Sequence, residues 1–64
     1  MAHIQKIVGG GATFEDLLQF VEECKEKKIP RNTPVKISQH VDKTLSDVVD
    51  MQADDESINF YDWI

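Results

Sequence analysis

Residues 49–60 read VDMQADDESINF, and their pattern predicts a β-hairpin. Apolar residues occupy alternate positions on either side of an acidic interruption: Val49, Met51, Ala53, Ile58 and Phe60. A period of two places successive side chains on opposite faces of a strand, so these residues share one face. The interruption is the expected tip of the hairpin: Asp54, Asp55 and Glu56. We expect this tip to be exposed, because unpaired carboxylates are costly to bury.

Upstream of the hairpin, a short strand, three glycines and a helix are expected in turn. Residues 4–8 are rich in β-branched side chains, and a glycine turn follows them. Thr13 has the side chain of a helix N-cap, so a helix is predicted from Phe14 to about Lys28, before Pro30. Its apolar stripe is expected to pack on the sheet, with Phe20 at the edge of that stripe: Phe14, Leu17, Leu18, Val21 and Cys24.

The remaining segments complete a small α+β domain. Residues 31–34 read as a turn, and residues 35–38 alternate like a half-buried strand. Residues 44–47 fit either the cap of a second short helix or a turn, and we expect a turn into the third strand because Val48 and Val49 suit a strand. The predicted order is β-α-β-β-β over residues 1–64, with one helix packed on the apolar face of a mostly antiparallel sheet.

Size and composition limit the possible classes of protein. A chain of 64 residues forms one domain with a small core, so self-association is an obvious additional source of stability. One cysteine, Cys24, cannot form an intramolecular disulfide, which favours the cytoplasm. No apolar stretch approaches the roughly 20 residues of a membrane span, and Met1–Lys6 lacks the layout of a signal peptide.

The charge of −5 is unevenly distributed along the chain. Residues 1–38 are nearly neutral, whereas residues 39–64 carry a net charge of −6. This balance argues against nucleic acid as a partner, because phosphate binding relies on clustered Lys and Arg. The acidic groups are either a solvated surface or a complement to a basic protein surface. In the second case the candidate contacts are Asp47, Asp50, Asp54, Asp55 and Glu56.

The end of the sequence is rich in large side chains. Residues 61–64 read YDWI. This segment either finishes the last strand over the core or anchors a partner, since Trp and Tyr dominate interface hot spots. If Ile58 and Phe60 face inward, alternation places Tyr61 and Trp63 on the opposite face, which favours a partner or a dimer.

Catalytic, metal and cofactor chemistry find little support in the sequence. His3, His40 and Cys24 have no spacing that joins them into a metal site, and Cys24 falls on the apolar stripe. His40 is read as a solvated residue at the end of the second strand. We therefore expect neither an enzyme nor a bound cofactor. A less favoured alternative is a phosphate or nucleotide site at the strand-to-helix loop, formed by Gly9, Gly10, Gly11 and Thr13.

Three motifs resemble a pattern in small uncharacterised proteins of bacteriophages and actinobacteria. The motifs are TFEDLL at residues 13–18, NTPVKIS at 32–38 and LSDVV at 45–49. The resemblance implies a phage or accessory bacterial protein that binds and modulates a host protein. Our leading hypothesis is accordingly a non-enzymatic interaction protein, with a self-associating structural module as the alternative.

Overall fold

The computed structural model describes residues 2–44 and 47–64. Within these ranges it contains one helix and a four-stranded sheet, so the predicted α+β class and element order are confirmed. The elements are β1 (His3–Gly9), α1 (Phe14–Glu26), β2 (Val35–His40), β3 (Val48–Asp54) and β4 (Ile58–Trp63).

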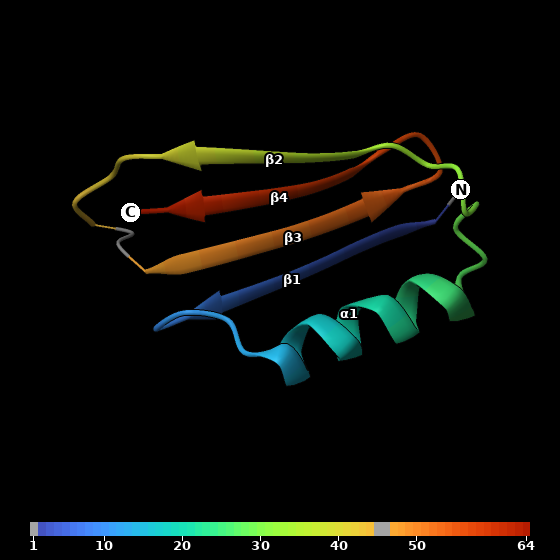
Figure 1. The fold of residues 1–64 in the computed structure, drawn as a ribbon, viewed down its shortest axis with the longest axis horizontal. Coiled ribbons are helices and arrows are strands. Elements are labelled where there is room, and N and C mark those ends of the chain that lie inside the picture. Colours follow the sequence, from blue (N-terminus) through green and yellow to red (C-terminus); the bar gives the residue numbers. More distant parts are fainter. Residues whose placement is uncertain (1, 45–46) are drawn as a thin grey trace.

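The sheet is mixed, with the strand order β1-β3-β4-β2 (Figure 1). Strand β3 pairs antiparallel with both β1 and β4, whereas β2 pairs parallel with β4. Strands β1 and β2 therefore form opposite edges, and the chain passes from one edge to the other through α1. The helix lies beside β1 and far from β2 (Figure 1), so it covers only part of one sheet face.

Strands β3 and β4 form the predicted hairpin. Ala53 lies opposite Ile58 and Met51 lies opposite Phe60. The turn is held by the side chain of Asp54, whose Oδ1 accepts backbone N–H bonds from Glu56 and Ser57, both at 2.8 Å. The predicted acidic tip is exposed at Asp55 and Glu56, while Asp54 is the half-buried last residue of β3.

The helix begins where its cap was predicted. Thr13 Oγ1 accepts a hydrogen bond from the backbone N–H of Asp16, and the Asp16 carboxylate accepts one from the backbone N–H of Thr13. This reciprocal capping box satisfies two donors that the first turn leaves free. The helix ends at Glu26, two residues before the predicted end, because Lys28 adopts a left-handed conformation with φ of 59°.

The prediction that the whole apolar stripe of the helix packs on the sheet is wrong. Phe20, assigned to the edge of the stripe, is 2% exposed, and Cys24 is also buried. The other members of the stripe are exposed: Phe14, Leu17, Leu18 and Val21. At 100° per residue, the mean direction of these four side chains lies roughly a quarter turn from the mean direction of Phe20 and Cys24. The helix thus contacts the sheet with one flank of its apolar side.

The core is small and lies between α1, β1 and the middle of the sheet. It consists of Ile4, Phe20, Cys24, Met51 and Ala53. Phe20 meets Phe60 edge to face, with ring centroids 5.6 Å apart and an interplanar angle of 61°. The β2 side of the same sheet face receives no cover from the helix.

The predicted turn over residues 44–47 is described only in part. Thr44 and Asp47 both lie in turns, and Thr44 donates hydrogen bonds from its N and Oγ1 to Asp42 Oδ1 at 2.9 and 2.7 Å. Leu45 and Ser46 lie outside the described residues.

Candidate interaction surface

The strand register assigns each side chain to one of two sheet faces. We call the side that carries α1 the helix face and the opposite side the open face. Because paired residues share a face, Phe60 places its partners Met51 and Ile37 on the helix face. The intervening residue Tyr61 places Asp50 and Ser38 on the open face. Within residues 2–44 and 47–64, no helix or strand covers the open face.

An aromatic cluster occupies one end of the open face. His40 stacks on Trp63, with ring centroids 4.7 Å apart and an interplanar angle of 28°, and it lies 5.7 Å from Tyr61. All three side chains are half-buried. His40 is therefore part of the cluster, and our interpretation of it as a solvated residue is wrong. Its Nε2 has no hydrogen-bond partner among the described residues.

One predicted acidic contact lies beside this cluster. Asp50 is the cross-strand partner of Tyr61 on one side and of Ile7 on the other. Its carboxylate accepts hydrogen bonds from Gln52 Nε2 at 3.0 Å and from Gln5 Nε2 at 3.3 Å. These amides fix the orientation of the carboxylate, and Ile7, at 61% exposure, adds apolar area to the same row.

The acidic hairpin tip lies at the other end of the sheet. Trp63 pairs with Val48 at the start of β3, whereas Asp54 ends that strand. Six residue steps of strand correspond to roughly 20 Å. The predicted contact residues thus form two separate groups. Asp50, Tyr61 and Trp63 are brought together, and Asp47 lies in the turn just before β3, at the same end of the sheet. Asp54, Asp55 and Glu56 are not part of that group.

Two backbone N–H donors of the glycine loop, those of Gly11 and Thr13, are already in use. Gly10 and Gly11 have positive φ values of 80° and 89°, which glycine adopts at little cost. The N–H of Gly11 donates to the carbonyl of Asp47 at 2.8 Å, so this loop holds the start of β3. The Asp16 carboxylate already occupies the capped helix start, and its negative charge disfavours a phosphate there.

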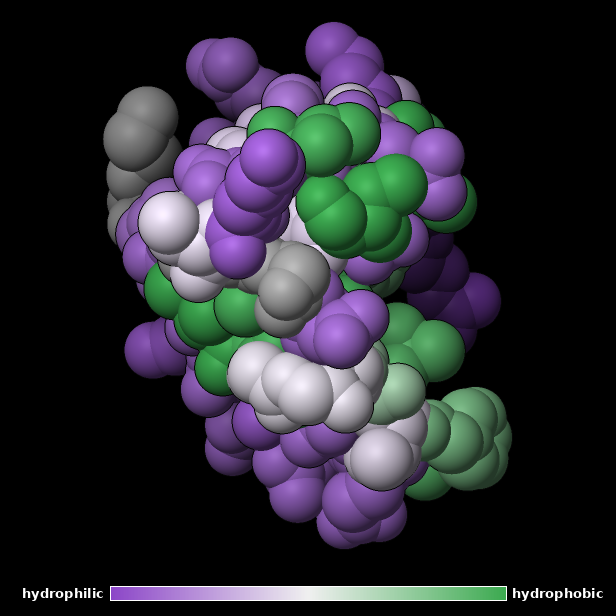
Figure 2. All heavy atoms as spheres, turned by 90° about the vertical axis from the view of Figure 1, so that its left-hand side faces the viewer, coloured by the Kyte–Doolittle hydropathy of each residue, from purple (hydrophilic) through white to green (hydrophobic). Residues whose placement is uncertain are grey.

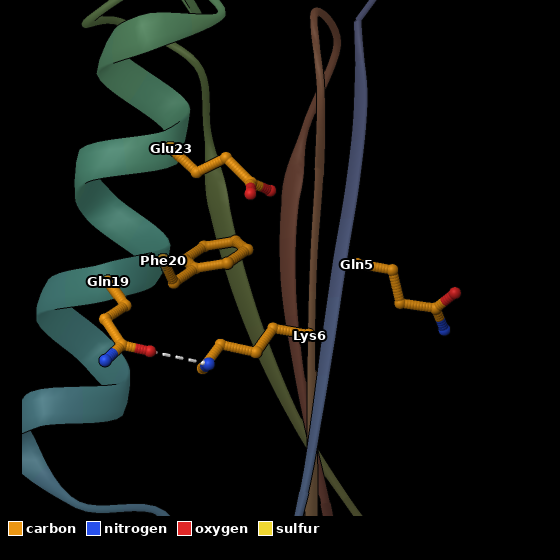
Figure 3. Close-up of a pocket in the computed structure, with 5 residues that line it drawn as sticks. All are labelled: Gln5, Lys6, Gln19, Phe20 and Glu23. Atoms are coloured by element: carbon orange, nitrogen blue, oxygen red, sulfur yellow. Dashed lines mark hydrogen bonds between the residues drawn. The ribbon is translucent and has the colours of Figure 1, made fainter.

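A hollow of about 220 Å³ lies between α1 and β1 (Figure 3). Lys6 points from β1 toward the helix and donates from Nζ to Gln19 Oε1 at 3.0 Å. Gln5, the next residue along the strand, points away to the open face. Glu23 lines the same hollow, so its negative charge offsets the positive charge of Lys6, the one cationic residue in the lining. The hollow has neither the positive charge of an anion site nor a pair of carboxylates for acid–base chemistry.

The described residues provide no other obvious chemical centre. None of them form a group of three or more His, Cys, Asp or Glu side chains suited to a metal ion. Burial and the nearby Glu23 raise the pKa of the Cys24 thiol, which opposes the formation of a nucleophilic thiolate. The helix of the described chain is neither long nor apolar enough to cross a membrane.

No family model matches this chain, and no curated protein or solved structure is significantly similar to it. Its function therefore has to be inferred from the surface that the fold creates.

Two members of this surface were missed by reasoning from sequence alone. Ile7 was recognised as a strand residue, but its exposed side could not be assigned before its pairing with β3 was known. His40 joins the cluster through the parallel pairing of β2 with β4. That pairing joins segments about 20 positions apart and leaves no mark in local periodicity.

Proposed function

We propose that this chain is a non-enzymatic protein-interaction module that binds a basic protein surface on its open face. The observation that carries the proposal is the uncovered cluster of Tyr61, Trp63 and His40 beside the oriented carboxylate of Asp50. Aromatic side chains supply contact area at low entropic cost, and a neighbouring carboxylate adds attraction for Lys or Arg.

The distribution of charge supports a basic partner. Residues 39–64 contain seven carboxylates, of which only Asp62 has a strand register position on the helix face. The others lie on the open face or in the turns at its two ends. A surface of one sign accelerates association with a partner of the opposite sign, and added salt reduces that advantage.

The sequence resemblance extends the proposal to the biological setting. A phage-encoded or accessory bacterial protein would act in the host cytoplasm, where it would bind and modulate a host protein.

The test begins with recovery of partners from a bacterial lysate at low salt, followed by titration of each purified partner. Asp50→Asn removes one charge from the open face and keeps the shape of the side chain. We expect it to weaken binding by about fivefold or more and to reduce the salt dependence. Glu22→Gln removes the same charge from the exposed surface of α1 and is the matched control, with no expected effect.

Two further variants separate the parts of the surface. Replacement of Asp54, Asp55 and Glu56 together by Ser tests the hairpin tip, and Trp63→Ala tests the aromatic cluster. Loss of binding by Trp63→Ala with an unchanged melting temperature would support an interface role. Unchanged affinity in both Asp50→Asn and Trp63→Ala would show that the open face is not the binding surface.

A further inference from the structure

On the helix face, an apolar trough lies between the exposed side of α1 and the part of the sheet formed by β4 and β2. One wall is the exposed apolar side of α1, where Phe14 is 72% exposed and Leu17, Leu18 and Val21 are 39–42% exposed. The groove at its base has a volume of about 440 Å³. Its lining is Ala12, Thr13, Phe14, Leu17, Val49, Met51 and Phe60.

The floor of the trough continues across the sheet to an open edge. Ile37 lies opposite Phe60 and Val35 lies opposite Ile58, so both residues of β2 are on the helix face. They are 75% and 55% exposed. Among the described residues, β2 pairs only with β4, which leaves its outer edge available as well. Apolar side chains gather in patches at the end of the molecule where β2 ends and α1 begins (Figure 2).

The molecule exposes more surface than a folded monomer of its size normally does. Its accessible surface is 4737 Å², whereas a monomer of its mass is expected to have about 4,200 Å². Its radius of gyration is 11.9 Å, against about 10.7 Å for a compact chain of this length. The excess of roughly 500 Å² is a large part of the ~800 Å² that each partner buries in a typical stable interface.

The charge and shape of this face suit a second copy of the chain. Asp62 is the only carboxylate of residues 39–64 at a strand position here. At 100° per residue the five carboxylates of α1 lie outside the exposed apolar row, so two copies can bring their apolar rows and floors together without placing one of these carboxylates between them. A two-fold interface requires one patch that is complementary to itself. The trough has both components, a protruding apolar row on α1 and an exposed apolar floor on β2.

We propose that the chain forms a symmetric homodimer in which the exposed row of α1 in each copy covers the β2–β4 floor of the other. The dimer leaves both open faces accessible, so this inference goes beyond the proposed function and does not depend on it.

The test uses sedimentation equilibrium of the full chain at several concentrations, together with a matched pair of variants. Ile37→Glu places a charge on the floor of the trough. Ile7→Glu makes the same change on the other edge strand, at a similarly exposed residue of the open face. We expect a wild-type dimer whose dissociation constant rises at least about a hundredfold in Ile37→Glu, because each dimer would bury two unpaired carboxylates. Ile7→Glu should change it less than about threefold.

A second variant, Phe14→Ser, tests the helical wall independently, and circular dichroism checks that each variant is folded. A folded Phe14→Ser that remains as dimeric as the wild type would overturn the proposal. A wild type that is monomeric at high micromolar concentration would also overturn it, and the trough would then be a candidate binding site for a different protein. Dissociation caused by Ile7→Glu alone would move the dimer contact to the open face.

Discussion

The orientation of α1 can be tested by two phenylalanines of the same helix. Phe20 is 2% exposed and packs against Phe60, whereas Phe14 is 72% exposed. Truncation of a buried Phe to Ala costs about 3–5 kcal/mol, through lost transfer energy, a residual cavity and the aromatic contact. Full burial of a Phe side chain is worth about 1.5–3 kcal/mol, so the small covered part of Phe14 should contribute less than about 1 kcal/mol.

These costs are large relative to the stability of the whole domain. At about 0.05–0.15 kcal/mol per residue, a chain of this length has roughly 3–10 kcal/mol in total. Phe20→Ala should therefore lose from about a third to all of this stability, whereas Phe14→Ala should remain folded.

The assay is urea unfolding followed by circular dichroism, carried out in an Ile37→Glu background to separate helix packing from dimerisation. With a slope near 1 kcal/mol/M, Phe14→Ala should lower the midpoint by less than about 1 M. An equal or larger loss in Phe14→Ala than in Phe20→Ala would refute the reasoning, because it would mean that the predicted stripe does face the sheet.

Three further predictions concern the cap, the acidic turns and the thiol. Thr13→Ala should lower the free energy of unfolding by about 1 kcal/mol in urea titrations. Thr13→Ser should lower it much less, because Ser keeps the hydroxyl that accepts the hydrogen bond from the Asp16 N–H. Hydrogen bonds from Thr13, Thr44 and the turn after Asp54 lower the pKa values of Asp16, Asp42 and Asp54 from the ordinary 3.8. Groups with a lowered pKa stabilise the fold above that ordinary value and lose this effect as the pH falls through the folded pKa. The melting temperature should therefore decline below about pH 4, and Asp54→Asn should reduce that decline. Cys24 should react with a thiol reagent at least about tenfold more slowly in the native protein than in concentrated guanidinium, and equal rates would contradict its burial.

Local chemistry accounts for the parts of the fold that were predicted correctly. The capping box depends on Thr13 and Asp16, three positions apart, and the hairpin depends on alternation around a short acidic turn. Both signals are contained in a few consecutive residues. The parallel pairing of β2 with β4 has no such local signal, since the two strands are separated in sequence by all of β3.

The orientation of the helix shows a different limit. A helical stripe identifies which residues avoid water, but it does not say what covers them. The sequence pattern was interpreted with the sheet as the only available cover, which placed Phe14 in the core and Phe20 at its edge. The structure divides the same apolar side between two directions, with Phe20 and Cys24 against the sheet and the exposed row facing the trough. A stripe wider than one contact surface is expected when a helix has two neighbours, and the described chain supplies only one.

The two proposed interfaces lie on opposite faces of one sheet, and they should respond differently to salt. Dimerisation through the helix face would be driven by burial of the apolar row of α1 on the β2–β4 floor, so its dissociation constant should depend less on added salt than partner binding does. Binding through the open face would combine aromatic contact with the acidic groups and should weaken as screening increases.

A homodimer that covers the helix face presents two identical open faces, so a basic partner should bind with a stoichiometry of two per dimer. Ile37→Glu should then reduce the apparent affinity for a surface that displays many copies of the partner, because avidity is lost, and leave the affinity for a single partner in solution unchanged. Asp50→Asn should reduce both affinities, because it acts on each site directly. These two patterns distinguish a defect in assembly from a defect in recognition.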